Sequence, residues 1–482
     1  MRRNKIQQYI YVALAFLGLG LTSCDNAFLD NAQPKGQMAP SNVFANAGVI
    51  GMAVNGLYYD YSTGLGSRLT IRTLQWLSDE GDYKLNPAYS FIYYTKANYE
   101  PIDPLGYCNT TWNAGYLTIY QANLLLEGLP SSTVITDAQR DAYLAAAYFM
   151  RGLNHFYLAL LFGDVPLVLT SDATTNVALA RTEKAKVMAQ VVSDMETALA
   201  KLPATAPADT RYYTSKYQVE AYLSYVYLAL GQWAKAEAAA TDVITNGGFS
   251  LVTDLTKILN KGSKEAILSV GSTVETTYPG TDDYGVLINV GQAAANMSPS
   301  DSLVRAYGSS DPRLDAWLPN GTVSGSTVVS RIPKKYKYSL SQAQTGASKA
   351  DPQTNVLLRL AEVYLIRAEA LIQQATATSI AAGIDDINVI RNRAGATPIP
   401  TDVTYTKEQA MAFVETERVL ELSFEGKRWL DLARWGTTDQ VYQNLKGNFK
   451  TGWASYKALL PVPATQLDAN SNLKPQNPGY AQ

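Results

Sequence analysis

The charged residues between Arg359 and Trp435 are the largest group of side chains whose spacing could support chemistry. Glu417, Glu421 and Glu425 recur every four residues, so on one helix they would share a face. Like charges in a column repel one another unless cations lie against them, and apolar residues fill the positions between. Such carboxylates can be catalytic, but we expect a structural network of ion pairs. The residues assigned to this network are Arg367, Arg391, Arg393, Glu417, Glu421, Glu425, Arg428 and Asp431.

Other catalytic arrangements have little support. His155 is the only histidine, whereas zinc sites and nucleophile–base pairs need several ligands or partners at defined spacing. No glycine-rich phosphate loop opens a helix after a strand, so the sequence predicts no nucleotide, metal or other cofactor. The pairs Asp79–Glu80 and Asp282–Asp283 could supply the carboxylates of a glycosidase, although adjacent residues point apart. Glycoside hydrolysis is kept as a less favoured alternative.

Carbohydrate binding asks for less, because a sugar stacks its C–H face on Trp or Tyr and offers hydroxyls to polar side chains. The stretch from Tyr58 to Tyr116 holds 13 aromatic residues, and residues 251–351 are rich in Gly, Ser, Thr, Tyr and Asn. Long segments without helical periodicity are often functional, so we expect a ligand site where these two regions meet. Each aromatic could instead be a core residue. The candidates are Trp76, Asp79, Tyr83, Trp112, Asn113, Tyr278, Tyr284 and Trp317.

Helices that pack in pairs are expected to position this site. The clearest pair covers residues 215–230 and 233–245, a helix–turn–helix unit of about 34 residues. Such pairs cannot bury both faces alone, so we expect a mainly α fold in which they stack as a right-handed, tetratricopeptide-like scaffold. Short strands are expected at 265–270 and 286–290. The other predicted helices span 112–129, 137–162 with Asp137 as N-cap, 182–202, 356–374, 380–393 and 407–435.

The first 23 residues have the pattern of a signal peptide, a basic start followed by a 12-residue apolar run from Ile10 to Leu21. That run is too short for a transmembrane helix, which needs ~20 residues. It ends at Leu21-Thr22-Ser23-Cys24, which is similar to the site where bacterial lipoproteins are acylated and cleaved. We therefore expect lipidation at Cys24 and a tether over residues 24–41; the alternative is an ordinary secretory peptide with an incidental cysteine.

The composition is that of a folded, mildly acidic chain. Of 482 residues, 47% are hydrophobic and 17% charged, which indicates a substantial core. Without the leader, 37 basic and 42 acidic residues remain, a net charge of −5 that disfavours nucleic acid as a partner. Cys108 would be the only cysteine besides Cys24, so no intrachain disulfide is predicted.

Several of these segments resemble the SusD/RagB family of outer-membrane lipoproteins. The resemblance is carried by LAEVYLIRAEA, IRNRAGA, ERVLELSFEGKRWLDLARWG and the tail LLPVPATQLDANSNLKPQNPGY, and upstream by TWNAGYLTIYQANLLLEGL and RDAYLAAAYFMRGLNHFYLALLFGDVPLV. It implies one body over residues 42–482, with tetratricopeptide-like helices over about 111–248 and 356–435 and an irregular tail over 436–482. The ligand-facing loops would cover about 58–110 and 251–351.

The resemblance also implies a function. It predicts a non-catalytic lipoprotein, anchored in the outer membrane and facing outward, that captures a glycan or other nutrient oligomer. Its expected partner is a TonB-dependent, SusC-like transporter, docked on the helical arc. The alternatives are an assembly scaffold without glycan binding and the carboxylate-dependent hydrolase.

Overall fold

The structure is a computed structural model, and it describes residues 40–66, 68–82, 92–102, 106–203, 213–270, 298–322, 329–336, 353–445 and 449–481. The predicted signal peptide, lipidation residue Cys24 and most of the tether lie outside these residues. So do the candidate site residues Tyr83, Tyr278 and Tyr284 and the strand expected at 286–290.

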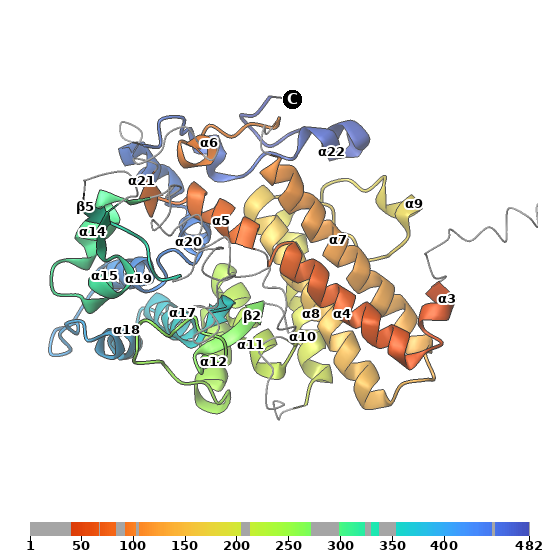
Figure 1. The fold of residues 1–482 in the computed structure, drawn as a ribbon, viewed down its shortest axis with the longest axis horizontal. Helices are drawn as coiled ribbons and strands as arrows, with labels where there is room; N and C mark the ends of the chain where they lie inside the picture. The colour runs from red at the N-terminus through yellow and green to blue at the C-terminus, as the bar shows by residue number, and fades with distance from the viewer. Residues whose placement is uncertain are drawn as a thin grey trace, which may run out of the picture.

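One half of the body is a bundle of long helices at the right of Figure 1, preceded by the short helix α3 (Pro40–Val43). The central helix α8 packs against α7 on one side and α10 on the other, and α4 crosses both α7 and α8. Side chains from Leu144 onward along α8 are almost all buried, which makes it the core helix of this half. The bundle consists of α4 (Ala47–Thr63), α7 (Tyr107–Gly128), α8 (Asp137–Phe162) and α10 (Lys184–Lys201).

The predicted bounds of α8 are confirmed, but its N-cap is Thr136 and not Asp137. The Thr136 side chain accepts a hydrogen bond from Gln139 N at 3.2 Å, and Gln139 Oε1 accepts one from Thr136 N at 3.0 Å. This reciprocal pair satisfies two N–H groups that a helix start leaves open. The helix ends at Gly163, whose φ of 78° lies in the left-handed region. Asp137 instead supplies negative charge to the first turn.

Stacked helix pairs form the other half. Helix α11 packs on α12, α12 on α17, and α17 on both α18 and α19. The predicted pair around Gly231 is confirmed, with φ of 69° at that glycine. The fold is therefore mainly helical and tetratricopeptide-like, as predicted. The bounds are α11 (Lys216–Ala229), α12 (Trp233–Asn246), α17 (Leu360–Gln373), α18 (Ala377–Ala394) and α19 (Lys407–Glu421).

The two regions expected to be loop-rich contain more regular structure than predicted. Residues 355–359, expected to start a helix, instead form β6, which pairs antiparallel with β2. This strand is buried along its whole length. A short apolar run of this kind fits a buried strand as well as the start of a buried helix, so the sequence could not distinguish the two. The elements in and next to these two regions are α5 (Arg68–Leu77), β1 (Gly81–Asp82), α6 (Ile92–Thr95), β2 (Ala266–Val270), β3 (Ser298–Pro299), α14 (Asp301–Tyr307), α15 (Pro312–Trp317), β4 (Asn320–Thr322), β5 (Val329–Arg331) and β6 (Asn355–Arg359).

The C-terminal tail is also more ordered than expected. Asn477 Nδ2 donates to Phe162 O at 2.9 Å and to Leu460 O at 2.7 Å, which fastens the tail to the end of α8. Tyr480 is buried. The remaining short elements are η1 (Leu129–Ser131), α9 (Ala173–Asn176), α20 (Arg428–Trp435), α21 (Thr438–Leu445), η2 (Ser455–Ala458), α22 (Ala464–Ala469) and η3 (Ser471–Leu473).

The helix predicted over residues 407–435 is broken. Helix α19 ends at Glu421 and α20 starts at Arg428, with Phe424 at φ 62° and Gly426 at φ 72° between them. Glu425 therefore lies in a turn and not in one helical column with Glu417 and Glu421. A non-glycine residue at positive φ is strained and persists only where its surroundings hold it. Phe424 is fully buried, and its N–H donates to Glu80 Oε1 at 3.1 Å.

The glutamates of this segment lie in a buried ionic cluster. Glu421 accepts hydrogen bonds from Arg313 at 2.9 Å, from Arg359 at 2.6 Å and from Arg393. Burial alone would raise the pKa of Glu421, but the guanidinium groups of Arg393, Arg359 and Arg313 hold it well below its usual range. Arg313 and Arg359 lie at the centre of the cluster, yet neither was in the predicted network.

The predicted network residues are all ion-paired, although not as one unit. Glu417 pairs with Arg313 at 2.6 Å and Arg391 at 2.9 Å, and Glu425 with Arg359 at 2.8 Å. The remaining pairs are Arg393 with Glu265, Arg367 with Asp386, Asp431 with Arg418 and Arg434, and Arg428 with Asp79. The stabilising role of these pairs stays a prediction.

Arg359→Ala tests that role. It would remove a cation that pairs with Glu265, Glu421 and Glu425, and all three of these carboxylates are buried. We expect a loss of about 3–5 kcal/mol in the free energy of unfolding, measured by denaturant titration. The matched control is Lys186→Ala, whose pair with Glu183 is exposed (67% and 68%) and should be worth less than about 1 kcal/mol. Equal effects of the two variants would contradict a structural role for the cluster.

Candidate functional site

The two regions expected to form the ligand site meet at the β1–β3 pair. Gly81 lies opposite Pro299 and Asp82 opposite Ser298, in antiparallel register. Ser300 N also donates to Glu80 O at 2.8 Å, which extends the contact. We call this junction, with residues 79–82 and 298–300, the seam. Tyr83 follows β1 directly in the chain, and residues 271–297, which include Tyr278 and Tyr284, precede β3.

Glu80 is a buried residue of the seam. Its carboxyl accepts the Phe424 N–H and lies 3.2 Å from Ser78 Oγ. Burial, together with the negative charge of Asp79, raises its pKa to about 8. Ser78 Oγ also donates to Gln75 O at 2.7 Å, so a protonated Glu80 can complete the set by donating to Ser78. Glu80 thus joins the seam to the strained turn between α19 and α20.

Asp79, expected to hold a sugar hydroxyl, is committed to an ion pair. Arg428 binds it through both nitrogens, Nε at 2.9 Å and Nη2 at 3.1 Å, and also contacts Glu415 at 3.2 Å. The Asp79 side chain is 15% exposed. A ligand would have to compete with a bidentate guanidinium for its oxygens.

The three candidate tryptophans lie in the core. Trp76 and Trp112 are each 2% exposed and Trp317 is 1% exposed. Trp76 packs against the rings of Tyr94 and Tyr107, and Trp317 Nε1 donates to Leu255 O at 2.9 Å. The expectation of solvent-facing platforms is therefore wrong for these three residues in this structure. Amphipathic spacing could not separate a buried ring from a stacking ring.

Asn113 is exposed on α7 and accepts a hydrogen bond from Gln466 at 3.1 Å, so it faces the C-terminal tail. The Trp76 ring contacts the ring of Tyr107, the first residue of α7, and the same helix carries Trp112 and Asn113. Trp317 lies instead on α15, which packs against α14. The candidates thus fall into two groups. The structure does not gather them around one opening among the residues it describes.

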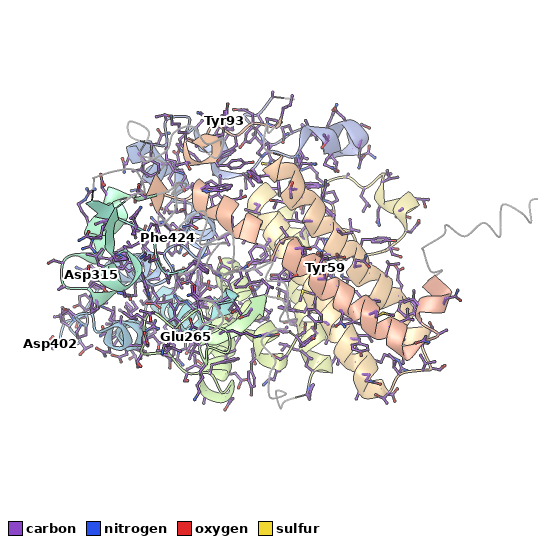
Figure 2. The ribbon with its side chains drawn as sticks, viewed as in Figure 1. Tyr59, Tyr93, Glu265, Asp315, Asp402 and Phe424 are labelled. Atoms are coloured by element: carbon purple, nitrogen blue, oxygen red, sulfur yellow. The ribbon has the colours of Figure 1, made fainter. Side chains whose placement is uncertain are left out.

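Tyr93 is an exposed aromatic that sequence reasoning missed. Tyr93 lies on α6 (Figure 2). Its side chain is 43% exposed, while its neighbour Tyr94 is fully buried. Tyr59 on α4 is also exposed, at 65%. The run Ile92-Tyr93-Tyr94-Thr95 forms a single helical turn, so periodicity could not tell which tyrosine faces solvent. Tyr93 belongs to the same aromatic region as β1.

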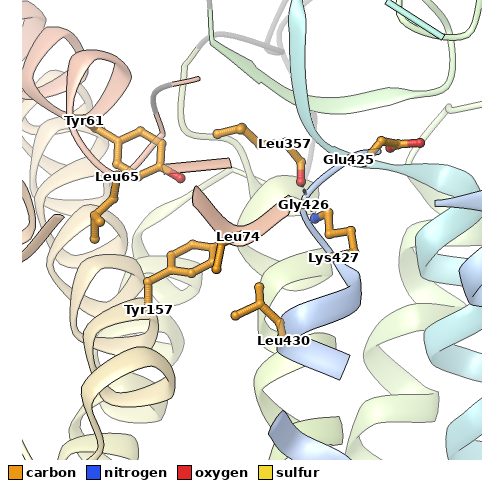
Figure 3. A pocket seen from close by; sticks show the side chains of 9 residues that line it. All are labelled: Tyr61, Leu65, Leu74, Tyr157, Leu357, Glu425, Gly426, Lys427 and Leu430. Atoms are coloured by element: carbon orange, nitrogen blue, oxygen red, sulfur yellow. Dashed lines mark hydrogen bonds between the residues drawn. The ribbon is translucent and has the colours of Figure 1, made fainter. Parts of the chain in front are cut away.

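A small cavity beside the turn between α19 and α20 is not a sugar site. It has a volume of about 20 Å³ and is lined by Tyr61, Tyr157, Glu425, Lys427 and several leucines (Figure 3). Lys427 Nζ crosses to Leu357 O at 2.6 Å. A cavity of this size holds about one water molecule, whereas ligand pockets measure roughly 300–1,000 Å³.

Catalytic and metal chemistry find no ready-made site in the described residues. There, no group of three or more His, Cys, Asp or Glu side chains could hold a metal ion. Burial and the nearby Arg151 cation lower the pKa of His155 to about 3, and its two ring nitrogens contact Arg151 O and Val168 N. Glu80 is buried and Asp79 is ion-paired, so the two do not present free carboxylates to a common opening. Asp282 and Asp283 lie outside the described residues.

Two family models match the chain. The SusD family model matches residues 324–480, and a model described as starch-binding and associating with the outer membrane matches residues 28–228. In the parts of the chain that the structure describes, no helix has the length and apolar character needed to cross a bilayer.

Curated relatives align along most of the chain. SusD-like protein P2 of Formosa agariphila is 28% identical over 97% of this chain and 99% of its own length. The starch-binding protein SusD of Bacteroides thetaiotaomicron is 39% identical, over 27% of this chain and 22% of its own.

Solved structures share the fold. A SusD homologue from Bacteroides thetaiotaomicron has a TM-score of 0.75 at 20% identity, over 93% of this chain and 100% of that one. A laminarin-binding SusD-like protein has a TM-score of 0.73 at 22% identity, over 90% and 100%.

Glu80→Gln tests the protonation of the buried carboxyl. The folded pKa of about 8 lies above the unfolded value of about 4.3, so the folded protein keeps a proton that the unfolded chain releases. The stability contributed by this group is therefore complete below about pH 4 and is lost as pH rises through about 8. Glutamine preserves both contacts without titrating. We expect the difference in unfolding free energy between pH 5 and pH 8 to shrink by a few kcal/mol, to order of magnitude, in Glu80→Gln.

The control for this experiment is Asp468→Asn, because Asp468 is an exposed carboxylate on α22. Its profile should match that of the unmodified protein. Parallel profiles for Glu80→Gln and the unmodified protein would mean that Glu80 is ionised in the fold.

Proposed function

Because the chain belongs to the SusD/RagB family, we propose that it captures a glycan, or another nutrient oligomer, for a TonB-dependent outer-membrane transporter. The names of two similar proteins state what they bind, starch for one and laminarin for the other, which supports glycan binding here. The observation that carries the proposal is the agreement with SusD-like proteins over nearly the whole chain, 97% for a curated relative and 93% for a solved structure.

The proposed binding site lies above the seam. The β1–β3 pair brings the aromatic region and the Gly/Ser/Thr/Tyr-rich region together, as a composite site requires. Tyr93 is the proposed stacking residue among the described side chains, and Tyr83, Tyr278 and Tyr284 stay predictions. The buried tryptophans are left out of direct contact, since no ring face is open to a sugar.

The proposed mechanism is binding without catalysis. A tyrosine ring stacks on the apolar face of a sugar and its hydroxyl stays hydrated, so the contact tolerates repeated units of one polymer. Modest affinity at each site is sufficient where many tethered copies engage one polysaccharide. The alternatives differ in their readouts. A hydrolase would release reducing ends, and a scaffold would not be retained on polysaccharide gels.

The family model describes association with the outer membrane. We propose that the attachment is a lipid on Cys24, that the body faces outward, and that the helical arc contacts the transporter. A soluble body on a short tether has a high effective concentration over a membrane partner. The support is the leader sequence and the family resemblance.

Tyr93→Ala tests the glycan site. We first screen the mature protein against a glycan array that includes starch and laminarin oligosaccharides, and then measure the variant by calorimetry. Loss of one stacking platform should cost about 1–3 kcal/mol of binding, by analogy with bases that stack on aromatic side chains. The control is Tyr59→Ala, because Tyr59 is more exposed and lies on α4. Equal binding by both variants would remove Tyr93 from the site.

Cys24→Ala tests the anchor. Stable attachment needs more than one acyl chain, all carried by the processed cysteine, so the variant should leave the lipidated membrane fraction. The measurement is incorporation of labelled palmitate, followed by fractionation of the membranes. If the unmodified protein takes up no palmitate, the lipoprotein assignment fails.

A further inference from the structure

A surface cleft lies where the N-terminal part of the chain joins the body, far from the seam. It has a volume of about 590 Å³ and lies between α3, the C-terminal end of α7 and the loop before α9. Figure 1 shows these elements together at one end of the long axis. Its lining includes the apolar side chains of Phe44 and Leu124, together with Gly128 and the polar residues Glu127, Ser131 and Ser171.

The walls of the cleft are fixed to one another. A Cβ atom on Gly128 would lie 1.9 Å from the Phe44 ring, so the glycine is required for the ring to pack there. Ser132 Oγ donates to Phe44 O at 2.9 Å. On the opposite wall, Glu127 accepts a hydrogen bond from Ser171 N at 2.8 Å. The cleft is therefore a preformed feature of the fold.

An exposed apolar strip leads along α7 into this cleft. Leu117, Tyr120 and Leu124 are spaced i, i+3 and i+7, so they share one face of the helix. Leu117 is 49% exposed and Tyr120 is 39% exposed. Leu169, on the loop bound to α7 through Asn123, is 43% exposed. Covering such a strip with the apolar side chains of a peptide removes apolar surface from water, which is favourable.

We propose that residues 25–39 of this same chain dock in the cleft and along the strip, with Phe28 and Leu29 as the apolar anchors. This stretch is polar apart from a few small and apolar residues, and Phe28 and Leu29 are its adjacent large apolar pair. Residues 28–40 could span up to ~40 Å when extended, and the segment joins the body at α3, which adjoins the cleft.

Only Lys35 suits the charge of the cleft, because Asp25 and Asp30 give residues 25–39 a net charge of −1. Lys35 is the only cationic residue between Cys24 and Pro40. Glu127 is an exposed carboxylate that lines the cleft, and the exposed Asp172 follows the lining residue Ser171 in the chain. Hydrogen bonds from Ser171 and Thr170 help to hold the pKa of Glu127 below its usual range despite slight burial. A lysine close to Pro40 can therefore reach a negatively charged rim.

Docking would give the tether a structural role. A free tether of this length lets a body rotate above the membrane, whereas a docked one presents the α3 end of the body toward the lipid. This consequence rests on the proposed lipid at Cys24. The docking itself does not, and it is independent of glycan binding at the seam.

Cysteine crosslinking in the full chain tests the docking. The variant pair is Phe28→Cys with Ser131→Cys, oxidised mildly in intact membranes and analysed by mass spectrometry. A disulfide forms only where Cα atoms come within about 7 Å, so closure reports direct approach. We expect most of the double variant to lose both free thiols.

The matched control pair is Phe28→Cys with Val403→Cys. Val403 is 51% exposed and follows Asp402, which Figure 2 labels at the other end of the molecule from α3. Ser131→Cys alone reports any crosslink to Cys24, while Cys108 is buried. Equal closure of the two pairs overturns the proposal. So does a thiol introduced by Ser131→Cys that reacts with maleimide as fast as the one introduced by Val403→Cys.

Hydrogen exchange gives a second test that needs no crosslink. The variant Phe28→Asp/Leu29→Asp should exchange faster than the unmodified chain at residues 124–133 and 168–172, and Asn26→Asp/Asn31→Asp should not. Unchanged exchange in the first variant would mean that residues 25–39 do not cover the cleft, which would leave it open to a separate molecule such as a sugar or another protein. That result would refute docking and leave the proposed glycan function untouched.

Discussion

The neutralisation of Glu421 is the interaction on which the rest of the structure depends. A single buried carboxylate is unstable in a protein interior unless cations and hydrogen bonds compensate for its lost hydration. Here the cations come from three separate places in the chain: Arg313 on α15, Arg359 at the end of β6 and Arg393 in the last turn of α18. Because all three converge on the end of α19, the loop-rich region and the stacked helices share one ionic core. No local sequence pattern could produce this convergence.

This core also sets the geometry of the seam. The chain must turn sharply after Glu421 so that Glu425 can reach Arg359 and Lys335. Phe424 takes a strained backbone conformation in that turn, and Glu80 fixes it through a hydrogen bond. The backbone oxygen of Glu80 also accepts a hydrogen bond from Ser300 N, so β1 and β3 are held against the turn. The base of the proposed ligand site is thus built on the ionic core.

Much of the helical scaffold could be predicted from the sequence, since apolar periodicity and capping residues are local. The bounds of α8 and the turn at Gly231 were predicted because capping signals act within a few residues of the helix ends, although the cap of α8 is Thr136 and not the predicted Asp137. The meeting of the two loop regions was also predicted from composition, but the β1–β3 pair that joins them was not. The recurrence of glutamates correctly indicated ion pairing, but not the partners, because Arg313 lies 104 residues from Glu417.

The failures share one physical cause. Residues 355–359 pair with β2, and the break between α19 and α20 satisfies Glu425, so tertiary contacts overrode local helix propensity in both places. The predictions for the tryptophans were wrong for the same reason. The sequence cannot distinguish a ring that packs on Tyr94, or one that donates to Leu255 O, from a ring that faces a sugar. Burial is a property of the whole fold. Asp79 likewise forms an ion pair with Arg428, which lies 349 residues away in the sequence.

The central claim is that the chain captures a glycan above the seam and uses the helices as support. Its most direct test is hydrogen–deuterium exchange of the mature protein with and without the oligosaccharide that the array screen selects. Slower exchange on ligand binding is expected at residues 79–82, 92–95 and 298–300, with the helix pair α11–α12 unchanged. Protection confined to α11, α12 and α17 would contradict the claim, because the helical arc would then be the ligand site.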